Sequence, residues 1–130
     1  MHCRSLTYYY EHPEYFMITA HRGASYEFPE NTMLAMQKAL EAGADMIEFD
    51  LRGTIENIPV VLHDKTIDRT SNGTGMPEEH TLSELKKLNF SWFLQDERPS
   101  TVPTCRTSGR TRHGGSLSVV VRINTTLLTT

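Results

Sequence analysis

Short apolar runs in the first half of the chain predict three strands. They lie at residues 17–20, 46–51 and 58–62, and each is bounded by glycine or by polar turn residues. Runs of this length between turn residues are typical of buried strands. Pro59 fits the third run, because a proline near the start of a strand removes no interior ladder hydrogen bond.

Two further stretches have the spacing of amphipathic helices. The apolar residues between 33 and 40 share one helix face, and Asn31 precedes them as the predicted N-cap. Gly43 follows, where a helix commonly ends in a left-handed residue. A capping box at residues 81–84 predicts a second helix, whose leucines recur at helical spacing.

The order strand, helix, strand, strand, helix predicts an α/β domain. The connection between the second and third strands, residues 52–57, is only about six residues long. Parallel strands normally need a crossover of roughly a dozen residues or more. The pattern alone therefore predicts an antiparallel hairpin within a mixed sheet.

Charge is divided unevenly along the chain. All 16 acidic residues and eight of the 13 Lys and Arg lie within residues 1–97. Residues 98–130 contain five Arg, no acidic residue and 12 Ser or Thr, with one β-like run at 117–123. This composition predicts an N-terminal extension at 1–16, a domain at 17–97 and a basic tail at 98–130.

The basic tail is unusual as the continuation of an acidic domain, and two explanations stay open. It is either not the native continuation, as in an out-of-frame reading or a truncated gene model, or a genuine flexible tail. The reading frame at the locus distinguishes the two. Nucleic-acid binding is not expected, because the tail has no aromatic residue among its five arginines.

The composition also bears on location and on cysteine chemistry. No apolar run approaches the roughly 18 residues of a membrane span, and the first 16 residues lack the apolar core of a signal peptide. We therefore expect a cytoplasmic protein. Cys3 and Cys105 are isolated, without metal-ligand spacing, so we expect both to be incidental.

Two acidic residues near the carboxyl end of the second predicted strand, Glu48 and Asp50, are candidate metal ligands. They are two apart on a strand, so their side chains point to the same side. Converging carboxylates repel each other unless a cation lies between them, and oxygen ligands suit Mg²⁺ or Ca²⁺. The alternatives are an exposed acidic strand face and an ion pair with Arg52.

His21 and His63 directly follow predicted strands, at the edge where α/β sheets place ligand sites. The pKa of histidine lies near neutrality, so such a pair suits general acid and base catalysis. Arg22 offers a fork for two phosphate oxygens. The alternatives are histidines with purely structural roles and a salt bridge from Arg22 to Glu30 or Glu48.

These residues belong to a series of motifs that resembles the glycerophosphodiester phosphodiesterase family over residues 17–93. In order, the motifs are Ala20-His21-Arg22-Gly23, Pro29-Glu30-Asn31-Thr32, Gly43-Ala44-Asp45, Glu48-x-Asp50, His63-Asp64, Asp68-Arg69-Thr70 and Asn72-Gly73-Thr74-Gly75. The ordered combination is far more specific than any one of its motifs.

The resemblance implies metal-dependent hydrolysis of small glycerophosphodiesters to sn-glycerol 3-phosphate and an alcohol. It implies that His21 and His63 form the acid–base pair and that Arg22 binds the substrate phosphate. Glu48 and Asp50 would bind the metal, Mg²⁺ or Ca²⁺. The alternatives are a phospholipase D-like relative that acts on intact lipid, and a non-catalytic fragment that binds metal and phosphate.

The resemblance also implies a TIM (β/α)8-type barrel, of which this chain would be a truncated N-terminal portion. A complete barrel needs roughly 200 residues or more. In the family the second and third strands are parallel neighbours, so we expect residues 58–62 to run parallel to 46–51 despite the short connection. The family takes a further metal-binding Glu from a later strand, but no acidic residue follows Glu97.

An incomplete barrel has an open sheet edge, which promotes aggregation. We therefore expect the isolated 130-residue chain to fold poorly or to aggregate, and to have little diesterase activity. Size-exclusion chromatography, thermal melting and an assay with glycerophosphocholine check this expectation. A monomer that melts cooperatively and hydrolyses the substrate with Mg²⁺ or Ca²⁺ would contradict it.

Overall fold

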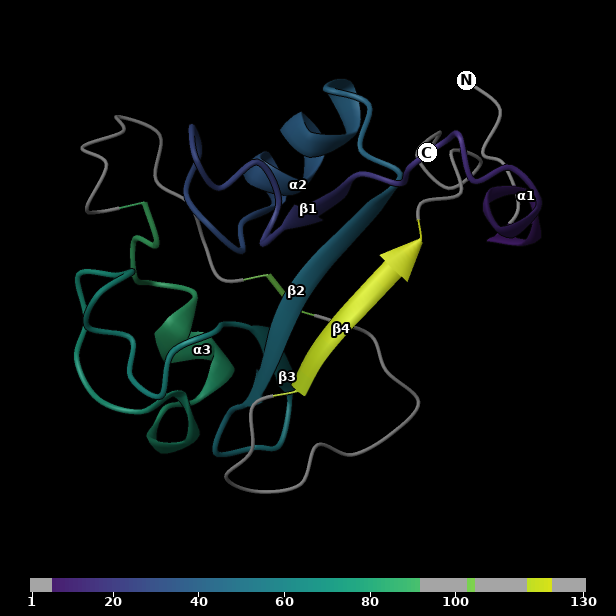
Figure 1. Ribbon diagram of the computed structural model, residues 1–130. Coiled ribbons are helices and arrows are strands. Elements are labelled where there is room, and N and C mark those ends of the chain that lie inside the picture. The colour runs from purple at the N-terminus through teal and green to yellow at the C-terminus, as the bar shows by residue number, and fades with distance from the viewer. Residues whose placement is uncertain (1–5, 92–102, 105–116, 123–130) are drawn as a thin grey trace, which may run out of the picture.

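A long central strand, β2 (Met46–Gly53), pairs with each of the three other strands that the structure describes. The structure is a computed structural model and describes residues 6–91, 103–104 and 117–122 (Figure 1). β1 (Thr19–His21) runs parallel to β2, whereas β3 (Pro59–Val61) and β4 (Leu117–Arg122) run antiparallel to it. The three predicted strands and the β-like run of the tail are thus all strands. Both cysteines and most of the predicted tail lie outside the described residues.

β1 and β3 share one edge of β2, and β4 occupies the other edge. Leu51 pairs with Val61 of β3 and with Leu117 of β4, so those two strands lie on opposite edges. β1 pairs with the part of β2 that β4 also pairs, so β1 likewise lies opposite β4. Figure 1 shows this arrangement, with β4 alone on its side of β2. Over Met46–Leu51, β2 is therefore not the open edge that the sequence predicts for a truncated barrel.

The parallel direction expected for the third strand is wrong. β3 returns alongside β2 through a tight hairpin, as the short connection requires. Thr54 closes the turn, since its amide donates to the Ile58 carbonyl at 3.0 Å and its hydroxyl accepts from the Ile58 amide at 3.1 Å. Asn57 takes the left-handed conformation within the turn (φ 60°).

The helix between β1 and β2, α2 (Met33–Glu41), begins one residue later than predicted. Its N-cap is Thr32, whose hydroxyl accepts from the Ala35 amide at 3.2 Å. Asn31 cannot serve as the cap, because it is left-handed (φ 57°) and an N-cap needs an extended backbone. Gly43 is left-handed after the helix (φ 89°), as predicted.

The remaining helices are short. They are α1 (Leu6–Glu11), the 3-10 helix η1 (Pro77–Glu79) and α3 (Leu82–Leu85). The predicted capping box is confirmed, because the Thr81 hydroxyl accepts from the Glu84 amide and the Glu84 carboxylate accepts from the Thr81 amide. No helix among the described residues has the length and apolar character needed to cross a membrane.

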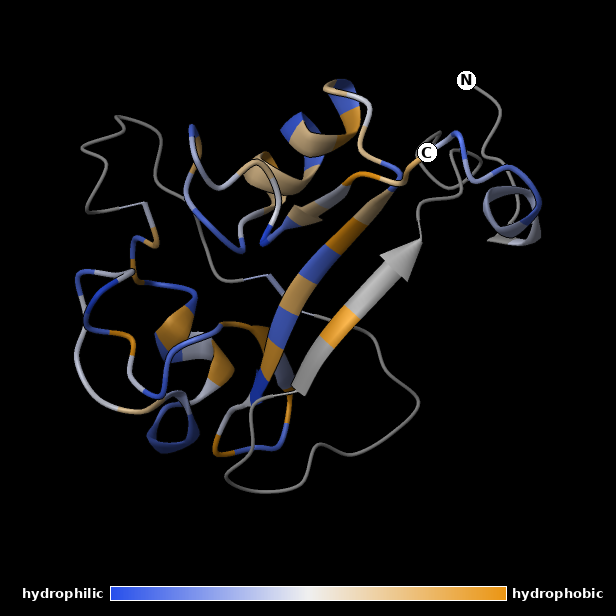
Figure 2. Ribbon diagram, in the orientation of Figure 1, coloured by the Kyte–Doolittle hydropathy of each residue, from blue (hydrophilic) through white to orange (hydrophobic). Residues whose placement is uncertain are grey.

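The sheet buries a different cluster on each face. Ile47, Phe49 and Leu51 alternate along β2 and pack with Ala39 of α2. The opposite face has a smaller apolar cluster: Val60, Leu62, Ile67, Leu85 and Phe90. Figure 2 shows the alternation along β2 as successive apolar and polar bands. The polar bands of β2 include the acidic residues of the candidate site.

We expect the connection between β1 and α2 to depend on Gly23. Gly23 is left-handed (φ 82°), and a Cβ added there would lie 2.6 Å from the backbone carbonyl carbon of Ala35. Gly23→Ala should lower the free energy of unfolding by about 3 kcal/mol or more, from backbone strain plus overpacking. Gly43→Ala, which has the strain without the Ala35 contact, should cost only about 1 kcal/mol. Equal losses in urea unfolding would contradict the close contact.

Candidate active site

The carboxyl ends of β1 and β3 meet beside the middle of β2. The Arg22 amide donates to the Glu48 carbonyl at 2.7 Å, and the Leu62 amide donates to the Asp50 carbonyl at 2.9 Å. Carbonyls two apart on a strand point to the same edge. Because β1 and β3 run in opposite directions along that edge, residues 21–22 and 63–64 approach the same stretch of β2 from its two ends.

The two candidate metal ligands lie inside β2, not at its carboxyl end. β2 continues to Gly53, so only β1 and β3 end at the site. Glu48 and Asp50 point to one face of the sheet, as the spacing predicts. The Nε2 atom of His21 lies 3.7 Å from a Glu48 carboxylate oxygen. His63 follows β3, which runs antiparallel to β2, so the β2–β3 hairpin brings His63 back toward this part of β2.

Arg22 lies between two carboxylates of the site. Its Nη1 donates to Glu30 at 3.1 Å, and its Nε lies 3.6 Å from Asp50 Oδ2. The structural ion pair with Glu30, an alternative from the sequence, is thus present. The alternative pairing of Arg52 with the candidate metal ligands is wrong, because Arg52 pairs with Glu78 at 2.8 Å. Arg52 thus points its charge to Glu78 and not to Glu48 or Asp50.

Arg69 joins the two halves of the site through four hydrogen bonds. Its Nη1 and Nη2 donate to the two carboxylate oxygens of Glu30 at 2.9 and 2.7 Å. Its Nε and Nη2 donate to the two oxygens of Asp64 at 2.6 and 3.0 Å. We call Glu30, Arg69 and Asp64 the Arg69 bridge. Asp64 Oδ1 in turn lies 2.7 Å from His63 Nδ1, so a chain of polar contacts runs from Asp50 through Arg22 and the bridge to His63.

The Arg69 bridge keeps its carboxylates ionised. Hydrogen bonds from Arg69, followed by one from His63, lower the pKa of Asp64 to about 2 against the opposing effect of burial. Hydrogen bonding to Arg69 likewise holds the pKa of Glu30 below its ordinary value. The two carboxylates raise the pKa of Arg69 above its already high ordinary value. The bridge is therefore permanently charged near neutral pH.

From the sequence, Glu30 is named only as an alternative ion-pair partner of Arg22. Asp64 and Arg69 have no predicted role, although each lies in a quoted motif. Glu30 and Arg69 are 39 residues apart, and no periodicity connects them. The available signal was chemical. Arg69 follows Asp64 by five residues in a predicted loop, and Glu30 lies just before the predicted helix. Charged side chains such as these must find partners when they are partly buried.

Glu48 and Asp50 are the residues that could hold a metal. Asp50 Oδ2 is buried and accepts no hydrogen bond within the described part of the chain, which suits a metal ligand. β4 supplies no further carboxylate, because its register places Val120 opposite Glu48 and Ser118 opposite Asp50. Among the described residues, no group of three or more His, Cys, Asp or Glu forms a closed metal cage. Two carboxylates suit Mg²⁺, which commonly completes its shell with water and substrate phosphate.

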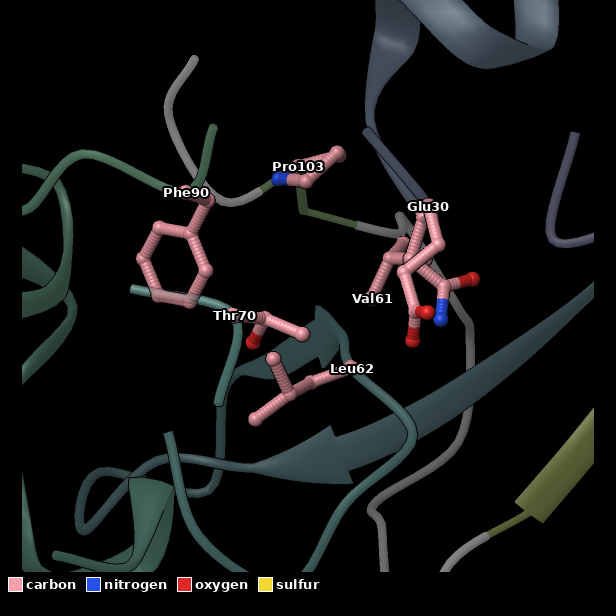
Figure 3. Close-up of a pocket in the computed structure, with 7 residues that line it drawn as sticks. Glu30, Val61, Leu62, Thr70, Phe90 and Pro103 are labelled. Carbon is pink, nitrogen blue, oxygen red and sulfur yellow. The ribbon is translucent and has the colours of Figure 1, made fainter. Parts of the chain in front are cut away.

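A small pocket lies beside Glu30 and, as the described residues line it, is too small for a glycerophosphodiester. Its cavity volume of about 10 Å³ is near the size that one water molecule requires, whereas ligand pockets have roughly 300 Å³ or more. In Figure 3, Thr70 and Phe90 lie on one side of the pocket and Glu30 on the other. Asn31 also lines it, and polar atoms of Asn31 and Thr70 are buried without a hydrogen-bond partner among the described residues. The pocket is therefore polar enough and large enough for a water molecule.

The fold and the site together define an α/β protein in which the segments that carry His21, Arg22 and His63 meet beside Glu48 and Asp50 of the central strand β2. The family model described as "Glycerophosphoryl diester phosphodiesterase family" matches residues 21–121. The chain belongs to this family. Its match extends beyond the resembling stretch at 17–93 and includes most of β4.

Relatives and solved structures agree with the family. The chain is 49% identical to a glycerophosphodiester phosphodiesterase of Caldanaerobacter subterraneus over 73 residues. This match covers 56% of this chain and 30% of the relative. It is 46% identical over 90 residues to glycerophosphodiester phosphodiesterase 1 of Homo sapiens, covering 67% of this chain and 27% of the relative. The chain therefore spans about a third of the length of the curated relatives it matches.

The crystal structure of glycerophosphodiester phosphodiesterase from Agrobacterium tumefaciens superposes with a TM-score of 0.67 at 40% identity, over 69% of this chain and 39% of that one. An Oleispira antarctica phosphodiesterase in complex with the product sn-glycerol-3-phosphate superposes with a TM-score of 0.65 at 35% identity, over 71% and 38%. These neighbours confirm the predicted fold class, since the chain superposes on an α/β portion of each of them.

We expect the Arg69 bridge to make stability depend on acid pH. The pKa of Asp64 is lowered from 3.8 to about 2, so its contribution is fully present above about pH 4 and is lost as pH falls through about 2. Urea unfolding should show Asp64→Asn destabilised by about 2 kcal/mol at pH 6. The difference should vanish below pH 2. Glu27→Gln, at an exposed site, should show no such trend, and a pH-independent loss in Asp64→Asn would contradict the prediction.

Proposed function

We propose that these residues form part of the active site of a metal-dependent glycerophosphodiester phosphodiesterase. The reaction would hydrolyse a glycerophosphodiester to sn-glycerol 3-phosphate and an alcohol. The observation that supports the proposal is that the ends of β1 and β3 meet beside Glu48 and Asp50, so the backbone segments that carry the five candidate residues adjoin one stretch of β2. The Oleispira relative, in complex with the product sn-glycerol-3-phosphate, supports the substrate class.

Arg22 would bind the phosphate of the substrate. Its side chain is 17% exposed and carries a planar set of donors, of which Nη1 is engaged by Glu30. Glu30 thus orients the guanidinium without consuming every donor. An arginine held in this way can present two N–H groups to two phosphate oxygens at little entropic cost.

His21 and His63 would move the two protons of the reaction. Hydrolysis forms a bond from a water oxygen to phosphorus and breaks the bond from phosphorus to the alcohol oxygen. One histidine accepts the proton that the water loses, and the other donates a proton to the departing alcohol oxygen. Their side chains are 66% and 42% exposed, so both remain accessible to a substrate.

Glu48 and Asp50 would hold Mg²⁺ or Ca²⁺ on the same face of β2. A bound cation would neutralise charge on the phosphoryl oxygens as the transition state forms. Without a cation, the two carboxylates would repel a phosphodiester anion. Arg22, whose Nε lies 3.6 Å from Asp50, already offsets part of that negative charge.

We expect the chain to bind sn-glycerol 3-phosphate only in the presence of Mg²⁺ or Ca²⁺. Phosphorus-31 NMR titrations check binding, and a coupled assay with glycerophosphocholine on the same sample checks turnover. Arg22→Met and Asp50→Asn should each weaken binding at least about tenfold. His63→Asn should leave binding intact and reduce any turnover by about 100-fold or more. Lys87→Met, which removes one charge from an exposed site near α3, is the matched control.

The outcomes separate the proposal from its alternatives. Binding without turnover would favour a non-catalytic fragment that binds metal and phosphate. Preference for lysophosphatidylcholine over glycerophosphocholine would favour a phospholipase D-like relative. Failure to bind sn-glycerol 3-phosphate at any metal concentration, or binding that chelation of the metal leaves unchanged, would contradict the proposal.

A further inference from the structure

The Arg69 bridge has no place in the proposed reaction, yet it is the most highly hydrogen-bonded charged group of the site. Arg69 approaches Glu30 end-on through Nη1 and Nη2, and Asp64 side-on through Nε and Nη2. Such paired contacts fix a carboxylate in both position and plane. The two anchored carboxylates each touch a residue of the proposed machinery, Arg22 on one side and His63 on the other.

The contact between Asp64 and His63 determines where the imidazole holds its proton. Asp64 is ionised, so its oxygens can only accept a hydrogen bond. Oδ1 lies 2.7 Å from His63 Nδ1, so Nδ1 must carry the hydrogen. In the neutral ring the lone pair then lies on Nε2, the atom that points away from Asp64. Only this tautomer presents a basic nitrogen to a substrate.

Asp64 alone could not hold this geometry reliably. It lies just beyond the end of β3, where no strand ladder restrains its side chain, and it is 26% exposed. Arg69 binds both of its oxygens and is itself fixed by Glu30, which precedes α2 on the opposite side of the site. Glu30 is only 14% exposed and therefore offers a firm anchor.

We propose that Arg69 is a positioning residue: through Asp64 it holds His63 in the Nδ1–H tautomer with Nε2 toward the substrate, and through Glu30 it ties that histidine to Arg22. The inference gives Arg69 a role in the proposed function and rests on it. Arg69 need not touch the substrate. Its fork geometry is required, because a lysine ammonium cannot bind both carboxylates in the same paired manner.

Nitrogen-15 NMR of the histidine rings tests the proposal on the full 130-residue chain. Protonated and unprotonated ring nitrogens resonate far apart, so each tautomer is read directly. Magic-angle spinning spectra near pH 8, where ordinary imidazole is neutral, require no soluble monomer. His63→Gln identifies the signals of His63 among the six histidines.

The wild-type chain should show a single Nδ1–H tautomer at His63. Arg69→Met, Arg69→Lys and Asp64→Asn should each give a mixture of tautomers, while backbone spectra report whether the fold survives. Lys65→Met, which removes a positive charge from an exposed neighbour of Asp64 without touching the bridge, should leave the wild-type tautomer. The single tautomer persisting in both Arg69 variants, or being absent in the wild type, would overturn the proposal.

This readout is independent of hydrolysis, so the two proposals fail separately. If the tautomer changes as expected but the chain does not bind sn-glycerol 3-phosphate, the proposed function is contradicted. The role of Arg69 in orienting His63 still stands in that case. A chain that binds and turns over substrate, but whose His63 tautomer ignores Arg69, would overturn the positioning role alone.

Discussion

The site depends on two backbone hydrogen bonds that β2 accepts on one edge. The Arg22 amide binds the Glu48 carbonyl and the Leu62 amide binds the Asp50 carbonyl, so β1 and β3 end facing each other. Along the sequence, every candidate site residue is one of the four residues joined by these hydrogen bonds or lies directly beside one of them. The hydrogen bonds are local to the sheet interior, where the alternation of β2 places apolar residues on the face toward α2 and Glu48 and Asp50 on the other.

The meeting of β1 and β3 beside β2 brings several charged side chains close together. The free-energy cost of burying an unpaired charge determines how they pair. A partly buried charge without a partner is strongly destabilising. Arg52 is paired with Glu78, away from the site, whereas Arg22 and Arg69 share Glu30. The resulting arrangement leaves the faces of His21 and His63 exposed while their surroundings are fixed. The proposed binding of a phosphodiester near two carboxylates would gain from such preorganised positive groups.

The sequence predicts much of the local structure and little of the long-range pairing. Apolar runs locate all three early strands, and the capping box at residues 81–84 is confirmed because it depends only on neighbours in the chain. The N-cap prediction is one residue early, because the left-handed backbone of Asn31 is not visible in composition. Loop length predicts the direction of β3 correctly, whereas the family resemblance misleads. The pairing of β4 with β2 and of Arg69 with Glu30 joins distant residues that no periodicity connects.

Scalar couplings across hydrogen bonds test the shared edge of β2 most directly. In the labelled 130-residue chain, we expect a coupling from the Arg22 amide nitrogen to the Glu48 carbonyl carbon. We expect a second coupling from the Leu62 amide nitrogen to the Asp50 carbonyl carbon. A coupling of the Asp50 carbonyl to any other amide, or a parallel pattern between residues 59–61 and β2, would contradict the arrangement from which the site is built.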